Sequence, residues 1–277
     1  MNGSSEQTAL PTLYIPHGGG PCFFMDWTMG PPDTWEKMAA WLRQLAASLG
    51  TVPKAIVVIS GHWEEDSFTV TGNPNPPLIY DYYGFPEHTY RLEYGAPGSP
   101  ALAQRICDLL AQAGLPARVD PARGFDHGVF VPFKLIYPDA EIPMVQLSLK
   151  TGLDPAAHIA LGRAIAPLRE EGVLIVGSGM SYHNMRGFMS RTGGEVSDQF
   201  DAWLTATAAD ADPERRNRKL ADWKSAPVAR AAHPREEHLL PLMVAAGAAE
   251  TDPGERIFTD RVMGATVSAF EFGAPRT

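Results

Sequence analysis

Cysteine is scarce in this sequence: only Cys22 and Cys107 occur among its 277 residues. Two cysteines cannot form a disulfide framework, and neither belongs to a C-x-x-C pair of the kind that binds zinc or carries redox chemistry. Cys107 lies in a helical pattern and is expected to pack as a small apolar residue. Cys22 stands near His17, but no sulfur-rich motif surrounds it, so we interpret it as structural as well.

Long apolar runs and an excess of basic charge are also missing. No run of about 18 apolar residues occurs, which argues against a membrane span or a membrane partner. The opening MNGSSEQTALP contains neither a basic nor an apolar segment, so we expect no secretory signal, loose order over residues 1–10 and a cytoplasmic location. The formal net charge of −9 disfavours a nucleic-acid partner, and the densest basic segment, PERRNRK at 213–219, is interpreted as a solvated connector.

The short motifs of several enzyme classes are absent too. The sequence contains no H-E-x-x-H, G-x-S-x-G, P-loop or G-x-G-x-x-G. Zincins, serine hydrolases, nucleoside triphosphatases and Rossmann dehydrogenases therefore lose their main support. The glycine-rich PHGGGP at 16–21 lacks the Lys and Ser/Thr that a phosphate-binding loop requires.

Short, β-branched and nearly uncharged runs are present instead, and they are typical of strands buried on both faces. Four of them are strong, at 12–15, 55–60, 142–149 and 173–179. Weaker strand candidates, expected nearer an edge of the sheet, are FTVTG at 68–72, ARV at 117–119 and ATVSAFEF at 265–272.

Helical patterns separate these runs, over 33–49, 99–114, 154–172, 197–209 and part of 236–246. Ser99 and Asp154 are expected N-caps, each followed by a proline suited to the first helical position. Pro241 should kink the last helix or belong to its first turn. The alternation predicts an α/β fold: a single domain over residues 1–277, with a central, mostly parallel or mixed sheet flanked by helices. The aromatic segment 72–90 is interpreted as a functional loop.

Three histidines stand at or just past the ends of strand-like runs. These are His17 in LYIPHGGGP, His62 in AIVVISGHW and His183 in VLIVGSGMSYHN. Ligands of open α/β sheets bind beyond the carboxyl ends of the strands, so these three side chains should meet at one edge. A lone histidine in such a place is more often an ordinary loop residue, but three together indicate a site. Glycines at 18–20, 177 and 179 would permit a close approach of backbone.

The other histidines are weaker candidates. His127 follows Asp126, which could orient its imidazole through a hydrogen bond; a turn whose polar groups satisfy one another is the alternative. His158 lies in a surface-type helix and is expected to be exposed. His88 belongs to the aromatic loop and would at most touch a substrate.

The segment HPREEHLL offers two more histidines, His233 and His238. Residues five apart do not share a helix face, so we expect a single member, His238 or Glu237, to point at the site. A helix start in which acidic residues are favoured by the dipole explains Glu236 equally well. An imidazole-rich site without sulfur suits Fe(II), Zn or Cu, and the spacing alone does not choose among them.

Six segments carry a resemblance to a known family. In order along the chain they are HGGGP, ISGHW, YGFPEHTYRLEYGAPGSPALAQRI, GFDHGVFVPFKLIYPDAEIPMVQLSL, VGSGMSYHNMR and HPREEHLLPLMVAAGAA. With them the chain resembles the class III extradiol ring-cleavage dioxygenases, in the branch that includes DOPA 4,5-dioxygenase, from about Leu13 to the final GATVSAFEFG. It departs from the family where HGGGP replaces the common HGSP and SGHW the common SAHW, and where Tyr182 precedes the histidine of GMSYHN.

The resemblance implies a role for five residues. His17 and His62 would bind the metal, and His238 would be the third protein ligand; Glu237 is the alternative, because a glutamate has this role in the distant protocatechuate-cleaving branch. His183 matches the family's acid/base histidine, which in some members also reaches the ion. His127 matches a second active-site histidine near the bound substrate.

The implied activity is cleavage of a catecholic ring by O₂ to a ring-opened semialdehyde, in the catabolism of aromatic compounds, with Fe(II) as cofactor. Zinc can occupy such a site after isolation. A catechol that chelates Fe(II) through both oxygens, with O₂ at another position, leaves room for few protein ligands. The aromatic residues expected to wall the pocket are Trp63, Tyr80, Tyr82, Tyr83 and Phe85. A zinc-dependent hydrolase using the same histidines and a non-catalytic metal-binding module are the alternatives, and a homo-oligomer is also left open.

Overall fold

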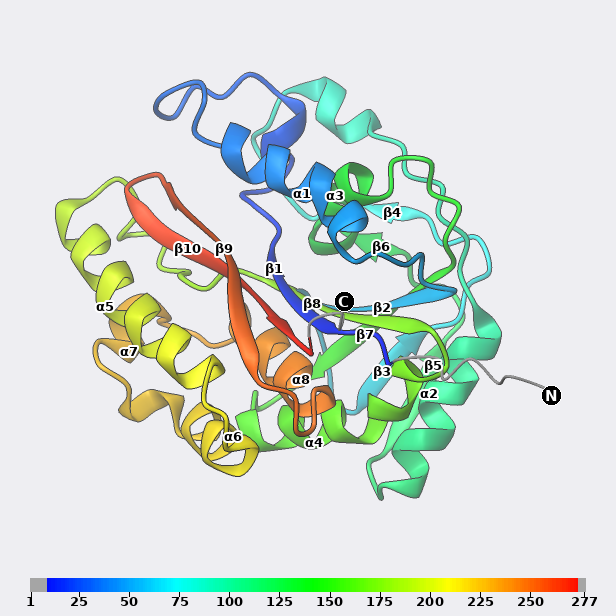
Figure 1. Cartoon of the computed structure of the whole chain (residues 1–277). Helices are drawn as coiled ribbons and strands as arrows, with labels where there is room; N and C mark the ends of the chain where they lie inside the picture. The colour runs from blue at the N-terminus through cyan, green and yellow to red at the C-terminus, as the bar shows by residue number, and fades with distance from the viewer. Residues whose placement is uncertain (1–8, 274–277) are drawn as a thin grey trace.

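A mixed sheet of eight strands forms the centre of the computed structural model, which describes residues 9–273 (Figure 1). In spatial order its strands are β5 (Ala117–Asp120), β3 (Phe68–Thr71), β7 (Met144–Lys150), β2 (Ala55–Glu65), β8 (Val173–Gly179), β1 (Thr12–Pro16), β10 (Ala265–Phe272) and β9 (Gly254–Val262). The middle four run parallel to one another, whereas β10 and β3 join them antiparallel on either side. A separate parallel pair is formed by β4 (Leu78–Ile79) and β6 (Phe125–Asp126).

The strand predictions are confirmed in their order of strength. The four strong runs form the four parallel strands at the centre, because nearly uncharged β-branched segments are those that a sheet covered on both faces can bury. The weaker runs form β3, β5 and β10, farther from the centre. Strand β9 was not predicted; its exposed positions carry charges such as Arg256 and Arg261, which hide the apolar alternation of an edge strand.

Helices cover both faces of this sheet. Those described are α1 (Glu36–Ser48), α2 (Pro100–Gln112), α3 (His127–Ile136), α4 (Pro155–Ile165), α5 (Arg191–Ala208), α6 (Pro213–Ala221), α7 (Ala229–Ala232) and α8 (Leu240–Ala248). Helix α8 packs against β8 and β1 with α4 behind it, while α3 packs against β2 on the opposite face with α1 against α3 (Figure 1). Helix α5 packs against β10. The predicted α/β architecture with flanking helices is therefore confirmed.

The helix ends follow their caps. The Ser99 side chain accepts a hydrogen bond from Leu102 N, and that of Asp154 accepts one from Ala156 N, as predicted. Pro241 lies in the first turn of α8 and not in its middle. The helix predicted from residue 33 begins at Glu36, three residues later than expected. The helix predicted from residue 197 begins earlier, at Arg191, because Ser190 caps α5 by accepting from Gly193 N.

Two surface predictions are wrong. The segment 213–219 is not a solvated connector but most of helix α6, and its Arg216 is completely buried, donating to Ala246 O (3.0 Å) and Glu250 O (2.9 Å). His158 is also buried and not exposed: its Nδ1–H donates to Asp154 O (2.7 Å), and its Nε2 accepts from Lys150 N (3.2 Å). Both side chains are buried because backbone atoms satisfy their polar groups with hydrogen bonds.

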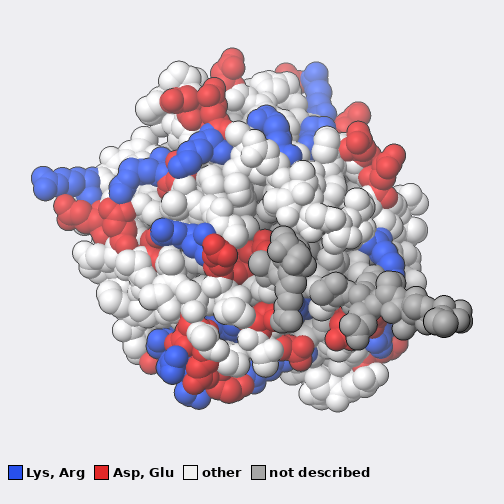
Figure 2. All heavy atoms as spheres, viewed as in Figure 1, with Lys and Arg blue, Asp and Glu red and all other residues white. Residues whose placement is uncertain are grey.

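The beginning of the chain and its surface were also covered by predictions. Residues 1–8 lie outside the described range, while Leu10 is buried and its N–H donates to Arg169 O, so the expected loose segment does not extend to Leu10. Among the described residues, no helix is both long enough and apolar enough to cross a membrane. On the face shown in Figure 2, basic side chains lie beside acidic ones, and uncharged surface separates these groups.

The burial of Arg216 generates a stability prediction. Arg216→Ala should lower the free energy of unfolding by about 3 kcal/mol, because it removes a buried cation and leaves buried carbonyl oxygens without donors. Arg218→Ala, on the exposed side of the same helix, should change it by less than about 0.5 kcal/mol. Urea denaturation followed by circular dichroism measures both. Equal effects would contradict the structural role of Arg216.

Candidate active site

Histidines gather where the carboxyl ends of neighbouring parallel strands meet. His17 directly follows β1, and its backbone N–H donates to Gly179 O at the end of β8 (3.1 Å). His62 lies inside β2, where the pairing with β7 is interrupted between Ile59 and Glu64. An interruption of this kind redirects side chains of a strand. The edge predicted from the sequence is thus the one at which these side chains lie.

Two glycines of β8 bring a distant segment against this edge. A Cβ atom on Gly179 would lie 2.1 Å from His238 O, and one on Gly177 would lie 2.3 Å from Pro241 O. The approach that these glycines permit is therefore that of the chain's own segment 238–241. In this way His238 reaches His62, 176 residues earlier in the chain.

Three imidazole nitrogens converge at this place. The Nε2 atom of His62 lies 3.3 Å from Nε2 of His17 and 3.2 Å from Nε2 of His238. His17 and His238 are buried, and His62 is half-buried. Nitrogen ligands from three separate segments, within one ion's reach of one another, are an arrangement that fits a divalent metal.

The opposite nitrogens of the three rings face oxygen atoms. The Nδ1–H of His17 donates to the carbonyl oxygen of the next residue (3.0 Å), and that of His238 donates to Glu237 Oε1 (2.9 Å). The Nδ1 atom of His62 lies 3.6 Å from Asp81 Oδ2. In His17 and His238 the acceptor on Nδ1 holds the proton there and leaves the lone pair of Nε2 free to face the other rings.

Burial also keeps these three imidazoles neutral. Removal from water, followed by the neighbouring imidazoles, holds the pKa of His17 and of His62 well below its usual range. The same causes lower the pKa of His238 to about 4, although the Glu237 carboxylate opposes the change. Metal ions bind neutral imidazole, so the folded chain presents all three in the form that binds.

Asp81 is a residue of this site that the sequence analysis missed. Its Oδ1 accepts from the backbone N (3.0 Å) and from Nδ1 (2.8 Å) of His127, while its Oδ2 faces His62. Burial opposes ionisation of the Asp81 carboxyl, but the hydrogen bonds from His127 outweigh it and lower its pKa. The one signal in the sequence was an acidic residue flanked by tyrosines in the aromatic loop.

Glu237 has the same place on the other side of the site. Its Oε1 accepts from Nδ1 of His238 (2.9 Å) and lies 3.2 Å from Nδ1 of His183. The rings of His183 and His238 stack with centroids 3.5 Å apart. Burial opposes ionisation of Glu237, but the two histidine hydrogen bonds lower its pKa below the usual range. The carboxylate thus lies behind the ring of His238, on the side away from the converging Nε2 atoms.

The predicted pairing of Asp126 with His127 is wrong. Successive residues of an extended segment face opposite sides, so Asp126 turns away from His127. Its carboxylate accepts from Ser60 Oγ (2.8 Å) and from the amide of Gln146. Asp81, from the aromatic loop, takes the place next to His127 that the sequence analysis gave to Asp126.

Two histidines lie outside the cluster. His233 is buried, its Nε2–H donates to Ser181 O (2.9 Å), and burial lowers its pKa to about 3. It does not join His238 at one site, in agreement with the five-residue spacing. His88 is exposed, and its Nε2–H donates to Phe24 O (3.0 Å).

The clustered histidines open into a cavity of about 280 Å³. Its walls include Tyr82, Tyr83 and Phe85, as expected from the sequence. Trp63 and Tyr80 do not line it, because the Trp63 indole donates to Glu65 and packs under Arg123, while the Tyr80 hydroxyl donates to Leu92 O. The walls that the sequence analysis missed are Trp27, Met29, Trp35, Met180, Met185, Phe188 and Met263.

Comparison with known proteins assigns this arrangement to a family. The family model of the catalytic LigB subunit of aromatic ring-opening dioxygenase matches residues 11–271. The chain belongs to this family. It is a ring-cleavage dioxygenase of the class III extradiol type, and the family favours this activity over the zinc hydrolase and the non-catalytic module.

Several named relatives are similar in sequence to this dioxygenase over most of its length. It is 40% identical to the 4,5-DOPA dioxygenase extradiol of Beta vulgaris, over 88% of this chain and 89% of that one. It is 36% identical to dioxygenase tasH of Hapsidospora irregularis, over 98% and 87%. The crystal structure of an uncharacterized protein from Escherichia coli K12 covers 95% of this chain and 100% of its own, with a TM-score of 0.76 and 31% identity.

The departures of this dioxygenase from the common motifs have local packing reasons. Gly20 of HGGGP has a φ of +57°, and a Cβ atom there would lie 2.9 Å from Cε2 of Phe85. Gly18, which HGGGP shares with HGSP, has a φ of +82°, and a Cβ atom there would lie 2.5 Å from Cys22 Sγ. Cys22 is buried, and burial raises the pKa of its thiol, as a structural role requires. A Cβ on Gly61 of SGHW would lie 3.0 Å from Glu237 O. Tyr182 is buried against Phe188 and does not line the cavity.

The contacts of Asp81 generate a second prediction. Asp81→Ala should leave the chain folded but lower oxygen consumption by roughly 10- to 100-fold, because His127 and His62 lose the carboxylate that orients them. Glu87→Ala, the other acidic residue of the same loop, should change little, since Glu87 is exposed and pairs only with Arg91. An oxygen electrode and circular dichroism give both readings. A fully active Asp81→Ala variant would show that His127 needs no orienting partner.

Proposed function

We propose that this protein is an Fe(II)-dependent extradiol dioxygenase that opens the ring of a catecholic substrate with O₂. The observation that carries the proposal is the convergence of the Nε2 atoms of His17, His62 and His238, each from a ring whose Nδ1 faces an oxygen. Several relatives are named 4,5-DOPA dioxygenases, which supports a catechol as the substrate class.

His17, His62 and His238 are proposed as the metal ligands. Three neutral imidazoles without a thiolate suit Fe(II), and zinc can occupy the same donor set. Glu237 is not proposed as a ligand, because its carboxylate accepts from the outer nitrogens of His238 and His183. Bound Fe(II) supplies electron transfer between the catechol and O₂ and polarises the catechol oxygens.

His183 is proposed as the proton acceptor. It lines the cavity, and its Nδ1 faces Glu237, which leaves Nε2 for a hydroxyl group of the substrate. Imidazole exchanges protons near neutral pH, and the adjacent carboxylate stabilises the ring once it has gained a proton. Its ring is stacked on His238, so the position fits proton transfer better than a place among the converging nitrogens.

His127 is proposed to bind the substrate at the other side of the cavity. Its Nδ1–H is held by Asp81, so Nε2 is left to contact the reacting oxygens. In the overall reaction one ring C–C bond beside the diol breaks, and both atoms of O₂ enter the semialdehyde product. The substrate supplies all the electrons, so no external reductant is needed. A cytoplasmic location and the absence of nucleic-acid and membrane partners stay predictions, and a homo-oligomeric assembly stays open.

The proposed function is tested by loading the protein with Fe(II) without oxygen, adding 4-methylcatechol, and then admitting air. One O₂ should be consumed for each catechol, and a yellow ring-opened product should appear. Protein loaded with Zn(II) should consume none, because zinc has no accessible redox state. Bound iron without oxygen uptake from any simple catechol would overturn the proposal. Oxygen-independent turnover by the zinc-loaded protein would favour the alternative function, a zinc-dependent hydrolase.

The proposed ligands are tested by metal retention. His17→Ala should weaken Fe(II) binding by more than about 100-fold, because it removes a proposed direct ligand. Loss of a residue that only hydrogen-bonds to a ligand typically weakens metal binding by roughly 10- to 100-fold. His88→Ala should retain iron like the parent protein, since His88 is exposed and only donates to Phe24 O. Iron is measured by mass spectrometry after dialysis against a weak chelator. Full iron content in His17→Ala would exclude that residue as a ligand.

The proposed proton acceptor is tested by His183→Gln. This variant should bind iron normally but lose roughly 100-fold or more in kcat, because glutamine cannot accept the proton. The measurement is oxygen uptake at saturating catechol, together with iron content. An unchanged kcat would transfer the role to His127.

A further inference from the structure

Apart from the histidines, the cavity wall is almost entirely apolar. Its remaining side chains come from Trp27, Met29, Trp35, Tyr82, Tyr83, Phe85, Met180, Met185, Phe188 and Met263. The hydroxyl of Tyr82 is already bonded to Thr89 O (2.6 Å). Among the described residues, no Lys, Arg, Asp or Glu side chain lines this cavity. Asp81 and Glu237 lie behind the histidine rings.

Exposed apolar side chains gather at the same place. Five large apolar residues are strongly exposed in the described part of the chain, and three of them, Met29, Tyr83 and Met185, line the cavity. A fourth, Met189, lines an adjoining hollow that shares Met29 with the cavity. Clustered exposed apolar groups mark a binding surface more often than chance, and methionine adapts to ligands of different shape.

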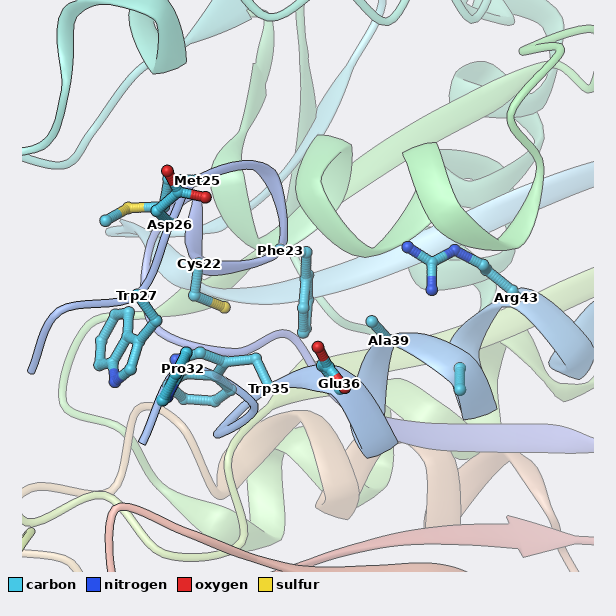
Figure 3. A pocket seen from close by; sticks show the side chains of 11 residues that line it. Cys22, Phe23, Met25, Asp26, Trp27, Pro32, Trp35, Glu36, Ala39 and Arg43 are labelled. Carbon is cyan, nitrogen blue, oxygen red and sulfur yellow. The ribbon is translucent and has the colours of Figure 1, made fainter. Parts of the chain in front are cut away.

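Cations near the cavity have other partners or lie outside it. Lys37 and Arg261 line the adjoining hollow, but Lys37 donates to Thr259 O (2.8 Å), and Arg261 pairs with Asp198 (2.7 Å). A further hollow lies behind the wall of Trp27 and Trp35, and its one arginine, Arg43, stands across the hollow from Trp27 (Figure 3). No such cation is placed to meet a carboxylate that enters the histidine cavity.

We propose that the substrate is a catechol with an uncharged, apolar alkyl or aryl substituent, and not one with a carboxylate or amino-acid tail. The inference rests on the proposed function, since it takes the diol to lie at the histidines. The substituent then extends along Met29, Met185 and Tyr83 toward the mouth, covering apolar surface that is otherwise exposed. A carboxylate there would lose water without gaining a cation, which disfavours its binding.

The test compares two probes of nearly equal shape, 4-propylcatechol and 3-(3,4-dihydroxyphenyl)propionate. Their dissociation constants are measured by calorimetry on the Fe(II)-loaded protein without oxygen, and their kcat/KM values afterwards in air. 4-Propylcatechol should bind at least about tenfold more tightly, because the carboxylate must be desolvated. The kcat/KM value should also be higher for 4-propylcatechol by a similar factor. This difference should come from a lower KM, with kcat similar for the two probes. Equal or tighter binding of the carboxylate probe would overturn the inference.

Variants locate the preference in the cavity wall. Met185→Arg should reduce the preference for 4-propylcatechol at least tenfold, because it adds a cation at the mouth. Val52→Arg is the matched control: Val52 is equally exposed but precedes β2, at the opposite edge of the sheet from His62, and the preference should not change. Arg186→Ala should also leave it unchanged, since Arg186 is exposed beside Met185 but does not line the cavity. A shift in Arg186→Ala, or none in Met185→Arg, would contradict the inference.

The two proposals fail in different ways. A stronger binding of 4-propylcatechol without any oxygen uptake would sustain the inference on the cavity and reject the dioxygenase reaction with catechols. Faster turnover of the carboxylate probe would sustain the reaction and reject the inference. The calorimetric reading does not depend on turnover, so either result is decisive for the cavity.

Discussion

The close approach of three imidazole nitrogens, with Nε2 of His17 and of His238 each within 3.3 Å of Nε2 of His62, is the constraint on which the rest of the structure depends. Neutral Nε2 lone pairs that face one another repel, so the cluster needs a rigid frame around it. The frame has two parts. Oxygen acceptors fix the Nδ1 side of the His17 and His238 rings, and glycines at the edge of the sheet let segment 238–241 approach backbone to backbone. The parallel order of the central strands follows from the same need, because it brings His17 and His62 to one edge.

Two half-buried carboxylates give this frame its charge. Asp81 and Glu237 each connect a converging histidine to one that lines the cavity without belonging to the converging set. Histidine hydrogen bonds keep both carboxylates ionised, and the converging imidazoles are neutral. Two negative charges behind neutral imidazoles would be compensated by one divalent cation, so the electrostatics favour a metal ion over water in this place. Each carboxylate also connects the position of a proposed reacting histidine to that of a proposed metal ligand.

Local patterns were sufficient to predict most of the fold. The central strands and the caps at Ser99 and Asp154 depend on hydrophobic runs and on neighbours within a few residues, and the structure contains them. Features that depend on distant partners were missed or mistaken. Arg216 is buried because three carbonyl oxygens from beyond residue 245 need a donor, and Asp81 is important only through contacts with His127 and His62. The histidines themselves were found because strand ends reveal them, whereas their orienting partners lie in a loop with no such signal.

One physical feature, the exclusion of water, connects the metal site to the choice of substrate. The aromatic and methionine walls that surround the histidines also lower their local dielectric, which keeps the imidazoles neutral and strengthens the carboxylate hydrogen bonds behind them. A cation placed in the same wall to attract a charged tail would stand close to the metal ligands and oppose the binding of a divalent ion. An apolar wall is therefore compatible with the binding of a divalent ion, whereas a positively charged wall would weaken that binding. The wall of this chain is apolar, apart from the histidines. Under the proposed function, such a wall would select among catechols by the cost of removing a charged substituent from water.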